Sequence, residues 1–117
     1  MPAVADTVNR YVELLGAGSA DELAELYTPD ATVEDPVGSG VRRGRDAIRE
    51  LYSRIEKQDR TTELLSVHIN GNEAAFLARL TIINDGGNTQ IDGIDVMTFD
   101  DAARITSMRA FWTAPEI

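Results

Sequence analysis

The chain has 117 residues, 43% hydrophobic and 26% charged, a balance typical of one globular domain rather than a disordered chain. Twenty acidic residues against eleven basic ones give a net charge of -9, which disfavours binding to nucleic acid or to an anionic membrane surface. With no cysteine and one histidine, the sequence excludes disulfides, thiolate chemistry and multi-histidine metal centres. Any chemistry is left to carboxylates, phenols, hydroxyls and arginines.

The first residues, MPAVADTVNRYVELL, lack the basic head and unbroken apolar run of a secretory signal. No apolar run approaches the ~18 residues that a membrane span requires. No internal repeat or linker divides the chain. The sequence therefore predicts a single domain over residues 1–117 with a cytoplasmic location and no membrane partner.

The N-terminal half of the sequence predicts three helices. The first follows an apolar stripe at steps of three and four residues: Val4, Val8, Tyr11, Val12 and Leu15. Gly16 is expected to end it. A capping box formed by Ser19 and Glu22 opens a second helix over 20–28, and a third is predicted over 45–57.

The remaining sequence alternates apolar and polar residues, which predicts strands. The predicted strands cover 31–35, 61–70, 73–84, 88–100 and 104–113. Turn sequences such as Asn70-Gly71-Asn72 separate the later ones. Helices followed by antiparallel strands indicate an α+β fold, with the helices packed on one face of a sheet.

Asp95 conflicts with its surroundings in the strand that ends at Asp100. It shares a strand face with Met97 and Phe99. If that face packs inward, burial disfavours the anion and raises the pKa of Asp95, so that it becomes a neutral hydrogen-bond donor. The alternative turns Ile94 inward and leaves Asp95 solvated.

Three tyrosines, Tyr11, Tyr27 and Tyr52, lie on the apolar stripes of the three predicted helices. If the helices cover one sheet, the phenols converge, and each hydroxyl can satisfy the next. The alternative is that each tyrosine is an ordinary core residue with a solvated tip.

Asp35 ends a predicted strand within T-V-E-D-P-V-G, on the same strand face as Val33. Pro36 fixes the direction of the chain after it, which would hold the carboxylate at the rim of a cavity. A turn-forming Asp-Pro pair is the alternative interpretation.

Two later strands carry apolar sets that could form the walls of a pocket or belong to the core. These sets are Met108, Ala110 and Trp112 on one strand, and Phe76, Ala78, Leu80 and Ile82 on the other.

These segments together resemble the bacterial steroid Δ5-3-ketosteroid isomerases, small members of the NTF2-like (SnoaL-like) superfamily. The resemblance covers nearly the whole chain. It is carried by N-R-Y-V-E-L-L around Tyr11, D-A-T-V-E-D-P-V-G-S at 30–39, R-E-L-Y at Tyr52, I-D-V-M-T-F around Asp95, and S-M-R-A-F-W at 107–112. It implies a cone-shaped α+β fold with three N-terminal helices on a curved, mostly antiparallel sheet.

The resemblance also implies an activity: moving a steroid double bond from C5–C6 to C4–C5 through a dienolate. Asp35 would be the general base, and Tyr11 with protonated Asp95 would bind the C3 oxygen, since this family keeps one catalytic carboxylic acid neutral at pH 7. Tyr52 and Tyr27 would support Tyr11. The implied substrate-binding residues are Trp112, Met108, Phe76, Ala110, Val96, Met97 and Phe99. The implied partners are a hydrophobic 3-oxo steroid and a second copy of the chain, bound through the exposed sheet face, with no cofactor or metal.

Two other interpretations remain open. An epoxide hydrolase or polyketide cyclase of the same fold would use polar groups in the same cavity, the hydrolase through an Asp-Arg-Asp grouping around a water. Arg79 and Arg109 lie out of phase with the inward strand faces, which disfavours the hydrolase. A non-catalytic NTF2-like binding module would instead keep Asp95 ionised.

Overall fold

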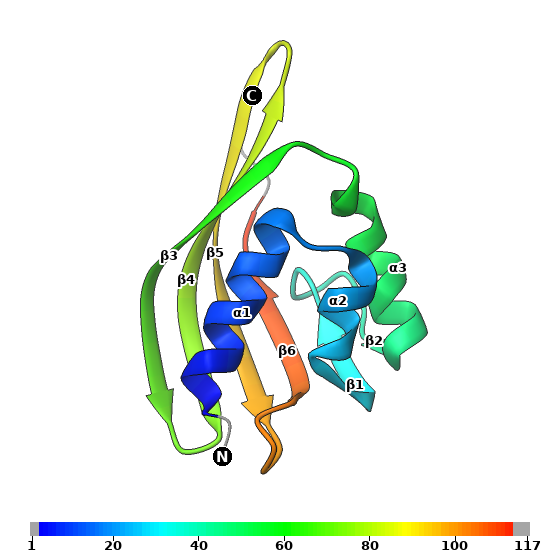
Figure 1. Cartoon of the computed structure of the whole chain (residues 1–117), viewed down its shortest axis with the longest axis vertical. Coiled ribbons are helices and arrows are strands. Elements are labelled where there is room, and N and C mark those ends of the chain that lie inside the picture. Colours follow the sequence, from blue (N-terminus) through cyan, green and yellow to red (C-terminus); the bar gives the residue numbers. More distant parts are fainter. Residues whose placement is uncertain (1–2, 114–117) are drawn as a thin grey trace.

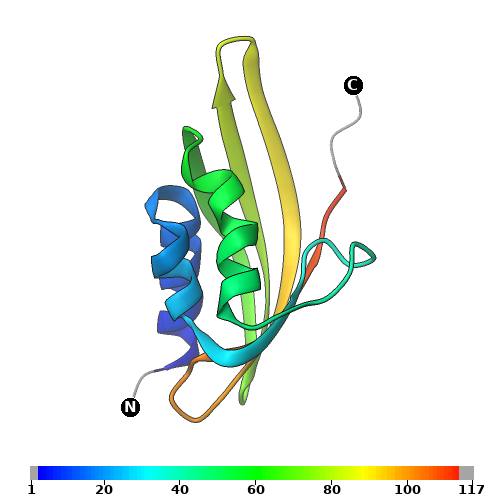
Figure 2. The same cartoon turned by 90° about the vertical axis from the view of Figure 1, so that its right-hand side faces the viewer.

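The computed structural model describes residues 3–113 and shows three helices on one face of a six-stranded sheet (Figures 1 and 2). The elements in chain order are α1 (Val4–Ala17), α2 (Ala20–Glu25), β1 (Tyr27–Glu34), β2 (Arg42–Arg43), α3 (Arg45–Glu56), β3 (Arg60–Asn70), β4 (Glu73–Asn84), β5 (Gly87–Phe99) and β6 (Ile105–Phe111). The predicted α+β class is confirmed. The predicted single domain over 1–117 extends at both ends beyond the described residues.

The strands follow the order β2-β1-β6-β5-β4-β3 in one curved, mixed sheet (Figure 2). Neighbours pair antiparallel except β1 and β6, which are parallel. The long strands β4 and β5 pair without a register shift from Glu73↔Thr98 to Asn84↔Gly87. Their continuous pairing makes them a firm floor for the helices and for any side chain that points toward them.

The second predicted helix is shorter than expected. It ends at Glu25, and Tyr27 begins β1, so the prediction of a helix over 20–28 with Tyr27 on its stripe is wrong. Tyr27 pairs with Ile105 of β6, and Arg45 donates two hydrogen bonds, of 2.9 and 2.6 Å, to the Tyr27 carbonyl. Tertiary pairing thus overrides a local apolar spacing that fits a helix. Pro29, which has no N–H to donate, lies where the register of β1 with β6 shifts.

The short strand β2 was not predicted from the sequence. Its two residues pair with Thr32 and Val33 of β1. A two-residue edge strand is too short to show any alternation. It returns the chain from the loop after Asp35 to the start of α3.

Arg60, at the start of β3, ties the ends of the helices together. Its guanidinium donates to the carbonyls of Leu15 (2.7 Å) and Gly18 (2.8 Å) at the end of α1, and to those of Glu56 (3.0 Å) and Gln58 (3.1 Å) at the end of α3. These carbonyls have no partner within their helices. Arg60 therefore fixes α1 and α3, the helices that carry Tyr11 and Tyr52, relative to the sheet.

The opposite face of the sheet carries no described helix (Figure 2). Leu77, Ile94 and Phe111 are neighbours across β4, β5 and β6 on this face. Ile94 is 48% exposed and Phe111 42%, and the Arg109 guanidinium lies 5.2 Å from the Phe111 ring centre. No described helix is long and apolar enough to cross a membrane.

Candidate active site

Asp95 points inward from the middle of β5. The side chains of Met97 and Phe99 on the same face are buried, Asp95 itself is only 8% exposed, and Ile94 on the other face is 48% exposed. The inward interpretation of this strand is therefore confirmed. Its cross-strand neighbours on the inner face are Phe76 of β4 and Ala110 of β6, both apolar.

Burial changes the protonation of Asp95. Loss of water and, after it, the negative charge of Asp35 together raise the pKa of its carboxyl from 3.8 to about 8. Within residues 3–113, no group hydrogen-bonds to the carboxyl to stabilise its anion. At pH 7 the side chain is mostly the neutral acid, so its O–H is a donor that faces the cavity.

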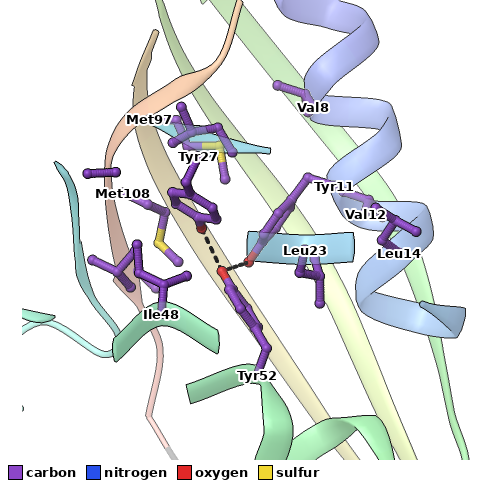
Figure 3. Close-up of a cluster of buried hydrophobic side chains, with 14 of the residues drawn as sticks. Val8, Tyr11, Val12, Leu14, Leu23, Tyr27, Ile48, Tyr52, Met97 and Met108 are labelled. Carbon is purple, nitrogen blue, oxygen red and sulfur yellow. Dashed lines mark hydrogen bonds between the residues drawn. The ribbon is translucent and has the colours of Figure 1, made fainter. Parts of the chain in front are cut away.

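The three tyrosine hydroxyls form a chain, as Figure 3 shows. The Tyr27 and Tyr52 oxygens lie 2.6 Å apart, and Tyr52 donates to the Tyr11 oxygen over 3.3 Å. Because Tyr52 has a single hydrogen and gives it to Tyr11, Tyr27 must donate to Tyr52. The order of donation leaves the Tyr11 hydrogen free for a ligand. The predicted convergence of the phenols is confirmed, although Tyr27 reaches it from a strand.

All three phenols remain protonated at neutral pH. Burial is the largest cause that raises the pKa of each one well above 10, and for Tyr11 the next cause is the charge of Asp95. The Tyr11 ring packs edge-on against Phe76, with centres 6.0 Å apart, and Phe76 is paired with Asp95. Two neutral donors, Tyr11 and Asp95, therefore lie at the same end of the cavity.

Asp35 follows β1 at the side of the same cavity and is half-buried. The Trp112 indole N–H donates to its Oδ1 over 2.5 Å. Burial raises the pKa of Asp35, while the Trp112 hydrogen bond and the positive charge of Arg42 oppose the rise. Asp35 therefore has partners that stabilise its anion, whereas Asp95 has none among residues 3–113.

The cavity between the sheet and α3 has a volume of about 660 Å³, within the usual range for small-molecule sites. Its walls come from α1, α3, the loop after Asp35, and the inner faces of β4 and β5. The lining residues are Tyr11, Leu15, Asp35, Pro36, Ser39, Gly40, Val41, Arg42, Leu51, Tyr52, Arg54, Ile55, Gln58, Ala78, Leu80, Ile82, Ile91, Gly93, Asp95 and Trp112.

Of the seven residues predicted to bind substrate, only Trp112 lines this cavity. The prediction that Val96 binds substrate is not supported, because strand alternation places Val96 on the outer face, where it pairs with Arg109. The other five point inward but are buried in the hydrophobic core and do not line the cavity: Phe76, Met97, Phe99, Met108 and Ala110. Figure 3 shows Met97 and Met108 in the cluster around Tyr27.

Several lining residues were missed by the sequence reasoning. Leu15, Leu51 and Ile55 carried a signal, because they belong to apolar helix stripes, but a stripe does not distinguish core from cavity wall. The loop 36–41 and the polar residues of α3 carried no signal. Within residues 3–113, no three His, Cys, Asp or Glu side chains gather as a metal site.

The comparisons with known proteins agree with this architecture. Residues 8–108 match the SnoaL-like domain, so the chain belongs to the SnoaL-like family. A steroid Delta-isomerase from Nocardioides simplex is 49% identical over 107 residues, covering 90% of this chain and 85% of that protein. The solved structure of SalBIII, an epoxide hydrolase/cyclase-like enzyme of pyran ring formation in the polyether salinomycin, superposes with a TM-score of 0.85 at 29% identity, covering 94% of this chain and 90% of that one.

The raised pKa of Asp95 predicts how stability depends on pH. Between pH 3.8 and about 8 the folded carboxyl holds a proton that the unfolded one has lost, so stability falls as pH rises through this window. Asp95→Asn removes this contribution. As pH rises through the window, the free energy of unfolding of this variant should increase relative to that of wild type by on the order of 1 kcal/mol per pH unit. Urea unfolding at several pH values measures this difference. Asp101→Asn, in an exposed turn, is the control, and a constant difference between Asp95→Asn and wild type would contradict the assignment.

Proposed function

We propose that this chain is a steroid Δ5-3-ketosteroid isomerase, which moves the C5–C6 double bond of a 3-oxo steroid to C4–C5. The observation that carries the proposal is the pair of carboxyl groups, Asp35 and Asp95, in one apolar cavity: Trp112 and Arg42 stabilise the anion of Asp35, and no described group stabilises that of Asp95. The relative from Nocardioides simplex supports the same activity. In this proposal residues 1–117 act as one domain.

Asp35 is the general base in the proposed mechanism. Its carboxylate takes a proton from C4, next to the ketone, and returns the proton to C6 of the same molecule. The Trp112 hydrogen bond orients the carboxylate and keeps it ionised while Asp95 is neutral. Burial keeps it basic, because a carboxylate stripped of part of its water binds a proton more tightly.

Tyr11 and Asp95 stabilise the dienolate that forms when C4 loses its proton. Negative charge moves to the C3 oxygen, and two fixed O–H donors face that oxygen without any need for solvent to reorganise. Tyr52 donates to Tyr11 and Tyr27 donates to Tyr52, so the charge on a bound oxygen is shared along the phenol chain. Neutral donors suit this apolar site, because a buried cation would need a permanent counter-ion.

The shape of the cavity fits a rigid apolar plate with one polar end. Gly93 and Ile91 lie two and four residues before Asp95 on β5, so the floor extends about 14 Å away from the donors at ~3.4 Å per residue. Ala78 and Leu80 of β4 pair with them and continue the same surface. Gly93 has no side chain to fill the cavity beside Trp112. A Cβ added at Gly93 would lie only 3.2 Å from the Cβ of Trp112.

Epoxide hydrolysis, suggested by the SalBIII likeness, fits the charged groups less well. Arg79 donates two hydrogen bonds to the Asp92 carboxylate on the outer face, and the Arg109 guanidinium stacks over the Phe111 ring on the same face. Among the described residues, no arginine forms an ion pair with Asp35 or Asp95. The described residues of this cavity therefore do not form the Asp-Arg-Asp group that would hold a water for epoxide hydrolysis.

Asp35→Asn tests the base directly. Because an amide cannot accept the C4 proton, the rate of conversion of 5-androstene-3,17-dione should fall by roughly 10²–10⁴-fold, followed by the absorbance of the conjugated enone. A phenolic steroid that mimics the dienolate should still bind, since Tyr11 and Asp95 remain in place.

Glu34→Gln is the matched control for that variant. It changes the neighbouring carboxylate, which accepts from the Gly38 N–H outside the cavity lining, and should retain the wild-type rate. Near-wild-type turnover by Asp35→Asn would overturn the base assignment. Absence of turnover by the wild-type protein would instead favour a non-catalytic binding module.

We also propose that two copies of the chain associate through the outer sheet face. The apolar row Leu77, Ile94 and Phe111 lies in the middle of that face, with no described helix over it. Exposed apolar patches of this kind are typical of protein interfaces, and pairing by the same patch on both copies gives a closed dimer.

Ile94→Asp places a charge in the centre of that row. Sedimentation at micromolar concentration should give a dimer for wild type and a monomer for this variant, because the buried charge would lack a partner. Val41→Asp, at a residue 64% exposed on the loop by the cavity, should remain a dimer. A wild-type monomer, or an Ile94→Asp dimer of unchanged affinity, would contradict the proposed interface.

A further inference from the structure

The cavity has two chemically different ends. The donors Tyr11 and Asp95 lie at the inner end, with Asp35 beside them. The outer part, toward the last turn of α3, is walled by Leu51, Ile55, Leu80, Ile82 and Ile91. Arg60 pairs with Ile82, which brings the end of α3 to the end of the β4–β5 floor farthest from Asp95 (Figure 2).

One charged side chain of α3 lines this outer part of the cavity. The acidic and basic residues that line the described cavity are Asp35, Asp95, Arg42 and Arg54. Arg42 pairs with Val33, two residues before Asp35, and its guanidinium lies 3.8 Å from Glu50 of α3, so this side chain stands between the two ends. Arg54 lies in the last turn of α3, at a helical spacing of three residues from Leu51 on the face that lines the cavity.

The Arg54 guanidinium is only loosely held by the protein. Its Nη2 lies 3.7 Å from Glu50 Oε1, beyond hydrogen-bond distance, and the side chain is 66% exposed. The same Glu50 oxygen lies 3.8 Å from the Arg42 guanidinium, so one carboxylate is shared by two cations. Arg42 also faces the negative charge of Asp35, whereas Arg54 has Glu50 as its ion-pair partner among the described residues.

We infer that Arg54 makes the outer end of the cavity a subsite for a carboxylate on the steroid's D-ring side. This inference rests on the proposed function and adds to it the class of substrate: a 3-oxo-5-ene steroid acid rather than a neutral ketone. A steroid with its C3 oxygen at Tyr11 and Asp95 extends along the apolar floor, and its far end leaves the apolar wall beside Arg54. A guanidinium binds a carboxylate through paired N–H donors, which a neutral substituent cannot match.

Binding of a product-like pair of ligands tests this subsite without turnover. The ligands are 3-oxo-4-androstene-17β-carboxylate and its methyl ester, which differ in charge at the far end alone. Their dissociation constants can be read from the fluorescence of Trp112, the single tryptophan, which lines the cavity. Arg54→Gln should reduce the preference for acid over ester by about fivefold to tenfold, because it removes the charge-assisted contact.

Arg43→Gln is the control for overall charge. Arg43 is exposed on β2 and does not line the cavity, so this variant loses the same charge and should keep the wild-type preference. With the matching 5-ene substrates, Arg54→Gln should raise KM for the acid and leave kcat unchanged, because proton transfer occurs at the other end. The wild-type preference should also weaken as salt is added.

The outcomes separate the subsite from the proposed function. An acid-to-ester preference that is the same in wild type and Arg54→Gln overturns the subsite, whether or not the enzyme turns over. Loss of that preference in Arg54→Gln supports the subsite. Absence of turnover of either 5-ene substrate by the wild-type protein would overturn the isomerase and leave the binding result standing.

Discussion

The candidate active site depends on the exclusion of water from one carboxyl group, that of Asp95. Asp95 stands on an apolar strand face with Phe76 and Ala110 as its cross-strand neighbours, and this raises its pKa to about 8. Such burial costs stability whenever the proton is lost. The cost is understandable if the neutral acid is the working group, because a neutral donor can face a developing negative charge that a carboxylate would repel.

The other parts of the fold maintain that environment. The paired strands β4 and β5 fix the floor, α1 and α3 bring Tyr11 and Tyr52 over it, and Arg60 holds the ends of both helices. Asp35 lies at the side, where Trp112 stabilises its anion. A difference of surroundings across one cavity thus stabilises the anion of one carboxyl group and the neutral acid of the other.

The sequence predicted the class of fold and most of the inner end of the site, because both rest on short-range periodicity. Alternation in β5 placed Asp95 correctly, and helical spacing placed Tyr11 and Tyr52. Tyr27 was placed on a helix because local spacing cannot show its pairing with Ile105. The cavity wall was the weakest part: periodicity assigns a face, but whether a residue such as Met108 meets a ligand or the core depends on what packs above it.

The protonation of Asp95 can be measured most directly by ¹³C NMR of its labelled side-chain carboxyl, assigned by its absence in Asp95→Asn. The expected chemical shift at pH 7 is that of a neutral acid, and it should change to that of a carboxylate with a midpoint near pH 8. A carboxyl that is already ionised at pH 5 would contradict it, and with it the role of Asp95 as a neutral donor.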